Sequence, residues 1–245
     1  MHGWYFVGDS HVQSFEIAAT FGLFRRPSRF LVVPGATAVG LRNPESHTQA
    51  IVQFQQALLP VLPGVVPVIQ LGEVDCGFVI WWRAQTLGEP VDAQLTESIS
   101  AYACFIDSLI DAGYGRVVVT GAVLPTIPDG QRQGAVARAR HTVTASLRQR
   151  TDLTLRYNER LAAEAARRGL PYIDISARVL DTGTGLIAEA YRSPNPRDHH
   201  LHPIRGAYAW ADAVNSLEDR PDGCPADHSF QIRAETAAPS HGEKA

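Results

Sequence analysis

The stretch Trp4-Tyr5-Phe6-Val7-Gly8-Asp9-Ser10-His11-Val12 decides the fold. Four apolar residues in a row are typical of a strand that helices cover on both faces. The glycine after them ends the strand, and apolar residues at three-to-four spacing predict a helix over Val12–Phe21. A buried strand that leads through a tight turn into a helix begins a crossover unit, so it indicates a parallel α/β sheet.

The same alternation of strand and helix recurs along the chain. We expect five parallel strands, at Trp4–Val7, Phe30–Val33, Val65–Leu71, Arg116–Thr120 and Tyr172–Ile175. The apolar spacing predicts helices at Val12–Phe21, Thr48–Leu58, Ala93–Ala112 and Val136–Arg168. Ligands of open α/β sheets bind at the carboxyl ends of the strands. The loops that follow the strands are therefore the places to look for a site.

Composition favours one globular unit. The chain has 245 residues, 45% of them hydrophobic, which is enough for one sizeable core. We assign residues 1–214 to an α/β domain and expect 215–245, which is mostly small and polar with little to bury, to be a flexible tail. A net charge of −3 argues against a nucleic-acid partner. Lys244 is the only lysine beside 21 arginines, a bias that favours a bacterial source with a G+C-rich genome.

The sequence predicts a cytoplasmic protein without a membrane partner. No apolar run approaches the ~20 residues that span a bilayer, and the amino terminus does not resemble a signal peptide. Cys76, Cys104 and Cys224 are odd in number and include no CxxC spacing, so we expect reduced thiols and neither a disulfide framework nor a cysteine metal site. Cys76 is a weak alternative nucleophile, because no base stands beside it in the sequence.

Two segments carry residues suited to nucleophilic catalysis. In Gly8-Asp9-Ser10-His11, Ser10 stands where the first strand ends, which places its hydroxyl and its N–H at the mouth of the sheet. The alternative is that Ser10 only caps the helix. Asp198-His199-His200-Leu201-His202-Pro203 supplies an imidazole base and a carboxylate to orient it. For any single histidine, a solvated polar loop remains the alternative.

Together these segments resemble the GDSL or SGNH hydrolases, serine esterases and lipases with a flavodoxin-like sheet. The resemblance implies a three-layer α/β/α sandwich around a five-stranded parallel sheet, with Ser10 as the nucleophile. His200-Leu201-His202-Pro203 matches the block around the family's catalytic histidine. It implies His200 as the base and Asp198 as its partner, with His202 and then His199 as alternatives. Gly35-Ala36-Thr37 matches a glycine that donates to the oxyanion, which implies Gly35, or Gly40 in its place.

Two departures from the family pattern stand out. The third block reads Gly72-Glu73-Val74-Asp75, with Val74 where the family has an oxyanion-binding asparagine, and Asp198 lies two residues before His200 rather than three. Loss of one oxyanion donor typically costs ~10²–10³ in turnover, so backbone N–H groups of residues 73–76 are candidates to replace it. We expect the oxyanion and substrate-binding residues to be Gly35, Gly72, Glu73, Asp75 and His202.

The leading hypothesis is a serine esterase that removes a small acyl group, such as acetyl, from a carbohydrate or another polar alcohol. Its substrate would be a small-molecule or glycan ester, with no cofactor and no metal. An acyltransferase would use the same site. A binding module that has lost activity is a second alternative, suggested by Val74. A metal-dependent phosphoesterase is a third, because Asp and His residues recur in the same segments. The oligomeric state stays open.

Overall fold

The central sheet is parallel throughout and has five strands. The computed structural model describes residues 3–218. Its strands are β1 (Gly3–Gly8), β2 (Ser28–Val32), β3 (Val65–Gln70), β4 (Val118–Thr120) and β5 (Tyr172–Ile173). They lie side by side in the order β2-β1-β3-β4-β5, with every pairing parallel. This is the flavodoxin-like order, and it confirms the predicted fold class and all five predicted strands.

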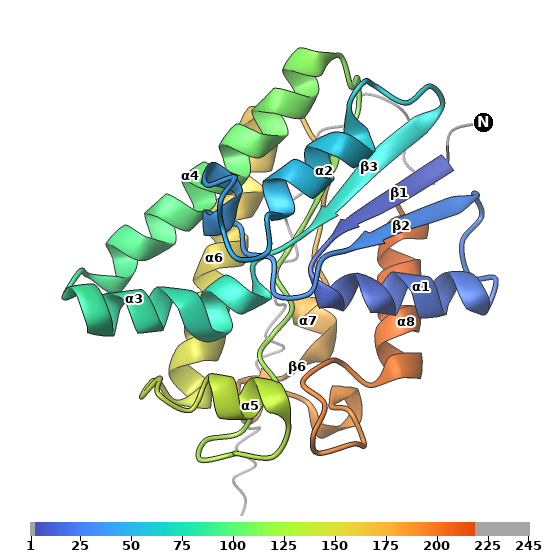
Figure 1. Ribbon diagram of the computed structural model, residues 1–245. Helices are drawn as coiled ribbons and strands as arrows, with labels where there is room; N and C mark the ends of the chain where they lie inside the picture. Colours follow the sequence, from blue (N-terminus) through green and yellow to red (C-terminus); the bar gives the residue numbers. More distant parts are fainter. Residues whose placement is uncertain (1–2, 219–245) are drawn as a thin grey trace, which may run out of the picture.

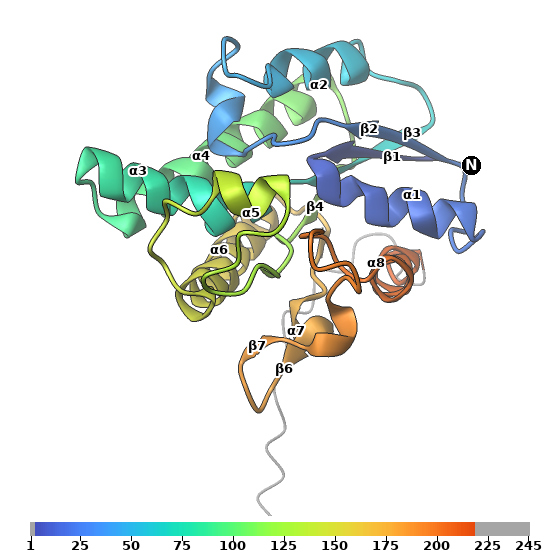
Figure 2. The same ribbon diagram turned by 60° about the horizontal axis from the view of Figure 1, so that its bottom comes forward.

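Helices cover both faces of the sheet (Figure 1). The longer ones are α1 (Gln13–Thr20), α2 (Ala50–Leu58), α3 (Ile80–Leu87), α4 (Val91–Ala112), α6 (Leu147–Arg167) and α8 (Pro203–Asn215). The view of Figure 2 shows α1 and α2 on opposite faces. One core cluster is built largely by α2, α4 and α6, and a second by α1 and α8. Within β1, Val7 points to the first cluster and Trp4 and Phe6 to the second, because side chains alternate along a strand.

Short elements complete the chain. They are the 3-10 turns η1 (Ser10–Val12), η2 (Val39–Arg42) and η4 (Glu189–Tyr191), the π-helical turn η3 (Asp75–Val79), the helices α5 (Ala135–Ala139) and α7 (Ser176–Val179), and the antiparallel pair β6 (Leu180–Asp181) and β7 (Leu186–Ile187). α3 and α8 were not among the predicted helices, and the first turns of α3 contain Trp81 and Trp82. Trp81 packs against the core, whereas Trp82 is exposed.

The predicted helix Val136–Arg168 is wrong in one respect, because it is two helices. Residues 140–146 between α5 and α6 are not helical. β-Branched Thr142, Val143 and Thr144 disfavour a helix there. Ser146 then starts α6 with a capping box, in which its hydroxyl accepts the Gln149 N–H and the Gln149 side chain accepts the Ser146 N–H.

Two glycines allow close packing at the ends of β1 and β3. A Cβ on Gly8 would lie 1.9 Å from the Gln70 carbonyl oxygen, so only glycine fits at this point. Gly72 has φ of +112°, and a Cβ there would lie 2.9 Å from both the Ala122 Cβ and the Tyr157 ring. The two strand ends therefore meet closely at the point where the strand order reverses, which is where this fold places its ligands.

α8 ends at Asn215, one residue past the predicted domain boundary. Residues 219–245, most of the predicted tail, lie outside the described residues. Within residues 3–218, no helix combines the length and the apolar character needed to cross a membrane.

Candidate functional site

The end of β1 carries the first unit of the site. Asp9 precedes η1, and its Oδ1 accepts the His11 N–H at 2.8 Å and faces the His11 ring Nδ1 at 3.1 Å. Both side chains are buried. Between them, Ser10 is 8% exposed, and neither its hydroxyl nor its N–H has a hydrogen-bond partner among residues 3–218. The hydroxyl and the N–H of Ser10 are therefore both available to a ligand, and the roles predicted for them stay predictions.

The loop before α8 repeats the same local arrangement. Asp198 Oδ1 accepts the His200 N–H at 3.0 Å and faces the His200 Nδ1 at 2.6 Å. Ser193 donates its hydroxyl to the other Asp198 oxygen at 3.1 Å. A spacing of two residues is thus sufficient to pair the carboxylate with the ring, because the aspartate first anchors the backbone N–H two residues on. The Asp198–His200 contact exists despite the departure from the family spacing.

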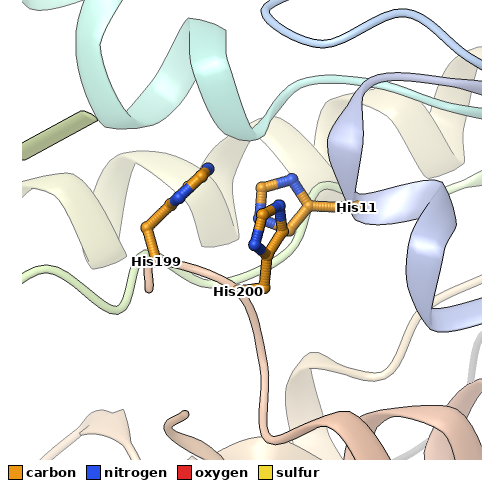
Figure 3. Close-up of side chains that lie close together, drawn as sticks. All are labelled: His11, His199 and His200. Atoms are coloured by element: carbon orange, nitrogen blue, oxygen red, sulfur yellow. The ribbon is translucent and has the colours of Figure 1, made fainter. Parts of the chain in front are cut away.

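The two units bring three imidazole rings together at the end of β1 (Figure 3). The ring centroids of His11 and His200 are 4.9 Å apart, and those of His199 and His200 are 4.1 Å apart. One nitrogen from each ring can be chosen so that all three lie within 4.8 Å of one another. Among the described residues, the Nε2 atoms of His11 and His200 are buried without a hydrogen-bond partner. These nitrogens are available to a substrate, a proton or a metal ion.

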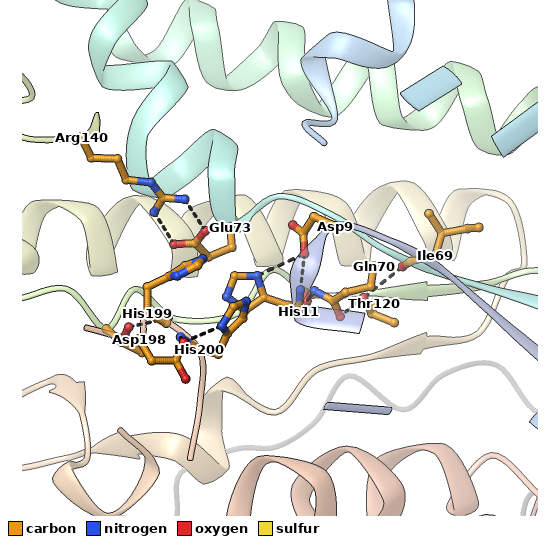
Figure 4. A network of polar contacts seen from close by, with 12 residues as sticks. Asp9, His11, Ile69, Gln70, Glu73, Thr120, Arg140, Asp198, His199 and His200 are labelled. Atoms are coloured by element: carbon orange, nitrogen blue, oxygen red, sulfur yellow. Dashed lines mark hydrogen bonds and ion pairs between the residues drawn. The ribbon is translucent and has the colours of Figure 1, made fainter. Parts of the chain in front are cut away.

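An ion pair closes the other side of this cluster (Figure 4). Arg140, directly after α5, donates from both guanidinium nitrogens to the Glu73 carboxylate at 2.7 and 2.8 Å. The Glu73 side chain is 2% exposed and that of Arg140 is 9% exposed. Burial raises the pKa of Glu73, but Arg140 outweighs burial and holds that pKa well below its usual range. Glu73 is therefore an anion that is paired with the Arg140 cation. This ion pair holds the segment around α5 over the site.

The histidines differ in their preference for a proton. Burial lowers the pKa of His199 to about 3. Burial and then the nearby His11 lower the pKa of His200, while Asp198 acts in the opposite direction. Burial also opposes the charge on His11, but Asp9 beside it outweighs burial and raises its pKa. At neutral pH His199 and His200 are neutral and can accept a proton or donate a lone pair.

Asp75 forms hydrogen bonds with the loop after β2. It is fully buried, and its carboxylate accepts the N–H groups of Ala38 and Val39 at 2.8 and 3.0 Å and the Ser98 hydroxyl at 2.7 Å. Burial raises the pKa of Asp75 despite these hydrogen bonds. In this structure Asp75 positions the 34–42 loop rather than facing the cluster.

The predicted glycines lie at the same edge of the sheet. Gly35, exposed and with φ of +77°, has an N–H without a hydrogen-bond partner among the described residues. The Gly40 N–H is not available in the same way, because it donates to the Thr37 hydroxyl at 3.0 Å. Gly72 is buried and makes room for Tyr157 and Ala122. Of the two alternatives for the second oxyanion donor, Gly35 is the one with an available N–H.

His202 stands apart from the three converging rings. It precedes α8, and its Nδ1 accepts the Arg205 N–H at 3.4 Å, so it caps that helix. His199, in contrast, lines a cleft of about 300 Å³ together with Asp198. The rest of that cleft comes from residues 126–137 and 189–197, many of them polar. A larger cavity of about 410 Å³ lies between α2 and α4, away from the histidines.

Comparison with known proteins identifies the architecture. Solved structures with the same fold include a GDSL-like lipase from Bacteroides thetaiotaomicron, at 14% identity and a TM-score of 0.58 over 88% of this chain and 87% of that one. An acetyl xylan esterase shares 15% identity at a TM-score of 0.51, over 88% of this chain and 98% of that one. The chain has the fold of the GDSL/SGNH hydrolases. No family model matches the sequence. No curated protein matches it either.

The sequence analysis missed two members of the site. Arg140 was read as part of a long helix, although the β-branched run after it was a signal that the helix ends there. His11 was not among the predicted site residues, yet its ring lies in the cluster. The Asp-x-His spacing at Asp9 and His11, identical to that of Asp198 and His200, was the signal that could have found it.

Proposed function

We propose that the protein is a serine ester hydrolase that removes a small acyl group, such as acetyl, from a carbohydrate or another polar alcohol. One observation carries the proposal. The Asp198–His200 pair presents a buried, unpartnered Nε2 at the same strand end that carries the available hydroxyl of Ser10. A serine, an imidazole and a carboxylate that orients the imidazole are the parts that acyl transfer needs.

In the proposed mechanism, Ser10 Oγ attacks the acyl carbonyl while His200 Nε2 accepts its proton. Collapse of the tetrahedral intermediate releases the alcohol, which takes the proton from His200 and leaves an acyl group on Ser10. Water then attacks this ester with His200 as the base again, and the acid leaves. No hydrogen bond joins Ser10 to His200 among residues 3–218, so the proposal requires a torsional adjustment of these side chains when substrate binds.

Oxyanion stabilisation falls to backbone amides in this proposal. The N–H groups of Ser10 and Gly35 are two donors at the edge of the sheet. Helical backbone begins at Glu73, and the N–H groups of residues 73–75 have no partner among the described residues, which makes them candidates for the third donor that Val74 does not supply. Cys76 is unsuited, since its N–H donates to the Gly72 carbonyl at 2.9 Å.

The substrate preference rests on the cleft that ends at His199. Gln131, Gln133, Arg192, Asn195 and Arg197 give it side chains that hydrogen-bond hydroxyl groups rather than long acyl chains. A cleft of about 300 Å³ is at the small end of the range for ligand sites, which fits a sugar unit. The acetyl xylan esterase among the fold relatives acts on a substrate of this class.

The test is active-site labelling and ester turnover on the same preparations. A fluorophosphonate probe should label the protein, and Ser10→Ala should abolish both labelling and cleavage of p-nitrophenyl acetate. Ser14→Ala, which removes another buried hydroxyl one turn along the same segment, is the matched control and should keep both. Labelling that survives in Ser10→Ala would rule out Ser10 as the nucleophile.

A further inference from the structure

The Nε2 atoms of His11 and His200 lie in the cluster of imidazole rings, and no hydrogen-bond donor of the described residues reaches them. The Nδ1 atoms of His11 and His200 each face an aspartate oxygen, and a carboxylate accepts hydrogen bonds. In the neutral ring the proton is therefore on Nδ1, and Nε2 carries the lone pair that a metal ion takes, displacing any proton bound there. Both Nε2 atoms are buried and have no partner among residues 3–218. Burial of a polar atom without a partner is costly, so this arrangement is stabilised by any group that accepts both lone pairs.

His199 adds a third nitrogen and a way in. Its ring lies 4.1 Å from that of His200 and 5.5 Å from that of His11, between centroids. His199 also lines the 300 Å³ cleft, whereas His11 is 1% exposed. An ion that enters through the cleft meets His199 first and the two buried nitrogens behind it.

The donor set fits a zinc-type ion. Zn²⁺ binds imidazole nitrogen at ~2.0–2.1 Å and prefers tetrahedral geometry, which places ligand nitrogens roughly 3.3 Å apart. The three nitrogens here lie within 4.8 Å of one another, so they need to approach by at most about 1.5 Å. Asp9 and Asp198 hold two of the rings by Nδ1, which is how carboxylates orient zinc-binding histidines.

The local charge also suits a divalent cation. Asp9, Asp198 and Glu73 lie around the three rings, and Arg140 pairs only with Glu73. The carboxylates of Asp9 and Asp198 are left beside the rings without a cationic arginine partner among the described residues. Hard cations such as Mg²⁺ prefer oxygen ligands, and an all-nitrogen set selects Zn²⁺, Ni²⁺ or Cu²⁺ instead.

The geometry points to a transition-metal site formed by His11, His199 and His200, at which bound Zn²⁺ inhibits ester hydrolysis. A metal on His200 Nε2 takes the lone pair that must accept the Ser10 proton, so the metal-loaded and the hydrolytic states exclude each other. The inhibitory effect rests on the proposed function, whereas the binding of the metal does not.

Metal binding is tested first, on the full chain with any affinity tag removed and after dialysis against EDTA. Titration with zinc chloride, followed by calorimetry and elemental analysis, should show one ion per chain. His199→Ala should weaken binding by at least ~100-fold, because it removes one of three ligands. His47→Ala, which removes an exposed histidine elsewhere, is the matched control and should bind like the original chain. Equal affinity of both variants, or no binding above that of a surface histidine, overturns the site.

His199→Ala is the deciding variant because the partly exposed His199 tolerates truncation, whereas His11→Ala removes a side chain packed at 1% exposure. Co²⁺ gives a second readout, since tetrahedral nitrogen coordination produces a visible absorption band that a loosely held surface ion does not. The band should appear with the original chain and with Ser10→Ala, and should be lost in His199→Ala.

Turnover of p-nitrophenyl acetate separates the inference from the proposed function. One equivalent of Zn²⁺ should suppress turnover and EDTA should restore it. Turnover that depends on Ser10 with no zinc binding overturns the inference and leaves the proposed function standing. If zinc binds at the three histidines but the metal-free protein shows no turnover, the metal site stands and the proposed function is overturned. Turnover that requires zinc supports the site but overturns both its inhibitory role and the serine mechanism.

Discussion

The two Asp-x-His units share one local geometry and differ in their surroundings. In each, the aspartate accepts the backbone N–H two residues on and then faces the ring Nδ1 of that same residue. Asp9 and His11 are almost fully buried at the end of β1, whereas the Asp198 side chain is 32% exposed and that of His200 21%. The turn fixes which ring nitrogen points inward, and the balance between burial and the neighbouring charges sets how readily the ring holds a proton. The pKa of His11 is raised, and that of His200 is lowered.

This difference suggests a division of labour within the proposed enzyme. The neutral, partly exposed ring of His200 is suited to accept a proton from a serine. A buried ring next to a buried carboxylate is a fixed part of the strand end. We therefore expect losses of activity to concentrate in the Asp198–His200 unit and losses of stability in the Asp9–His11 unit.

The largest effect should come from His200→Ala. Removal of the base should lower kcat/KM for p-nitrophenyl acetate by ~10⁴, since a triad member is lost. His202→Ala is the matched control, because it removes a neighbouring histidine that caps α8, and it should retain most of the activity. Similar, mild losses in both variants would mean that the loop is polar surface rather than catalytic machinery.

Asp198→Ala should come next. It leaves the His200 ring without its Nδ1 partner, so the tautomer is no longer fixed, and kcat should fall by roughly 10²–10⁴. Because solvent reaches Asp198, the free energy of unfolding should change by less than about 1 kcal/mol. Urea denaturation and steady-state kinetics on one preparation measure both quantities. A large loss of stability with little loss of turnover would contradict the expectation that the Asp198–His200 unit serves activity rather than stability.

Asp9→Ala is the matched change in the buried unit. It removes the same two contacts, but at a residue with 0% exposure, where the freed His11 N–H cannot reach water. The free energy of unfolding should fall by about 1–3 kcal/mol, the usual cost of an unsatisfied buried donor. Urea denaturation measures it against Asp198→Ala. Equal stability of the two variants would show that burial does not separate the two units.

Much of the fold follows from local sequence, and its failures have local causes. Short apolar runs bounded by glycine and proline indicated all five strands, because a strand covered on both faces has no polar side. The split between α5 and α6 was missed because apolar spacing continues across it, although α5 ends at Ala139 and a capping box at Ser146 starts a new helix. α3 was missed because the aromatic run at Trp81 and Trp82 is equally typical of core packing or of a pocket wall, and a turn of π-helix precedes it.

The candidate site was less accessible to sequence reasoning, because its members meet only in three dimensions. Ser10, Asp198 and His200 could be named from motifs, and their assignment as catalytic residues stays a prediction. Nothing local connects Glu73 to Arg140, which are 67 residues apart in the chain. The convergence of His11 with His199 and His200 likewise depends on where the loop before α8 crosses the end of β1.

The smallest expected effect concerns Val74, where the chain departs from the family. Val74 is partly exposed in the helical turn that follows β3, so an asparagine there can reach solvent and leaves no buried, unpaired amide. Val74→Asn should therefore keep the melting temperature of the original chain. If the nearby amides already form an oxyanion site, the added donor acts only where charge develops in the transition state, so turnover of p-nitrophenyl acetate should hold or rise by up to ~10-fold.

The matched control for Val74→Asn is Val74→Thr, which keeps the branched shape and adds a hydroxyl too short to replace an asparagine amide. A rate gain in the Asn variant alone would place the developing oxyanion beside this turn, on the same side as His200. An Asn variant that melts at lower temperature and cleaves no faster would instead show that Val74 fills an apolar contact. The helical turn after β3 would then have no part in oxyanion binding, and Ser10 and Gly35 would have to supply the donors by themselves.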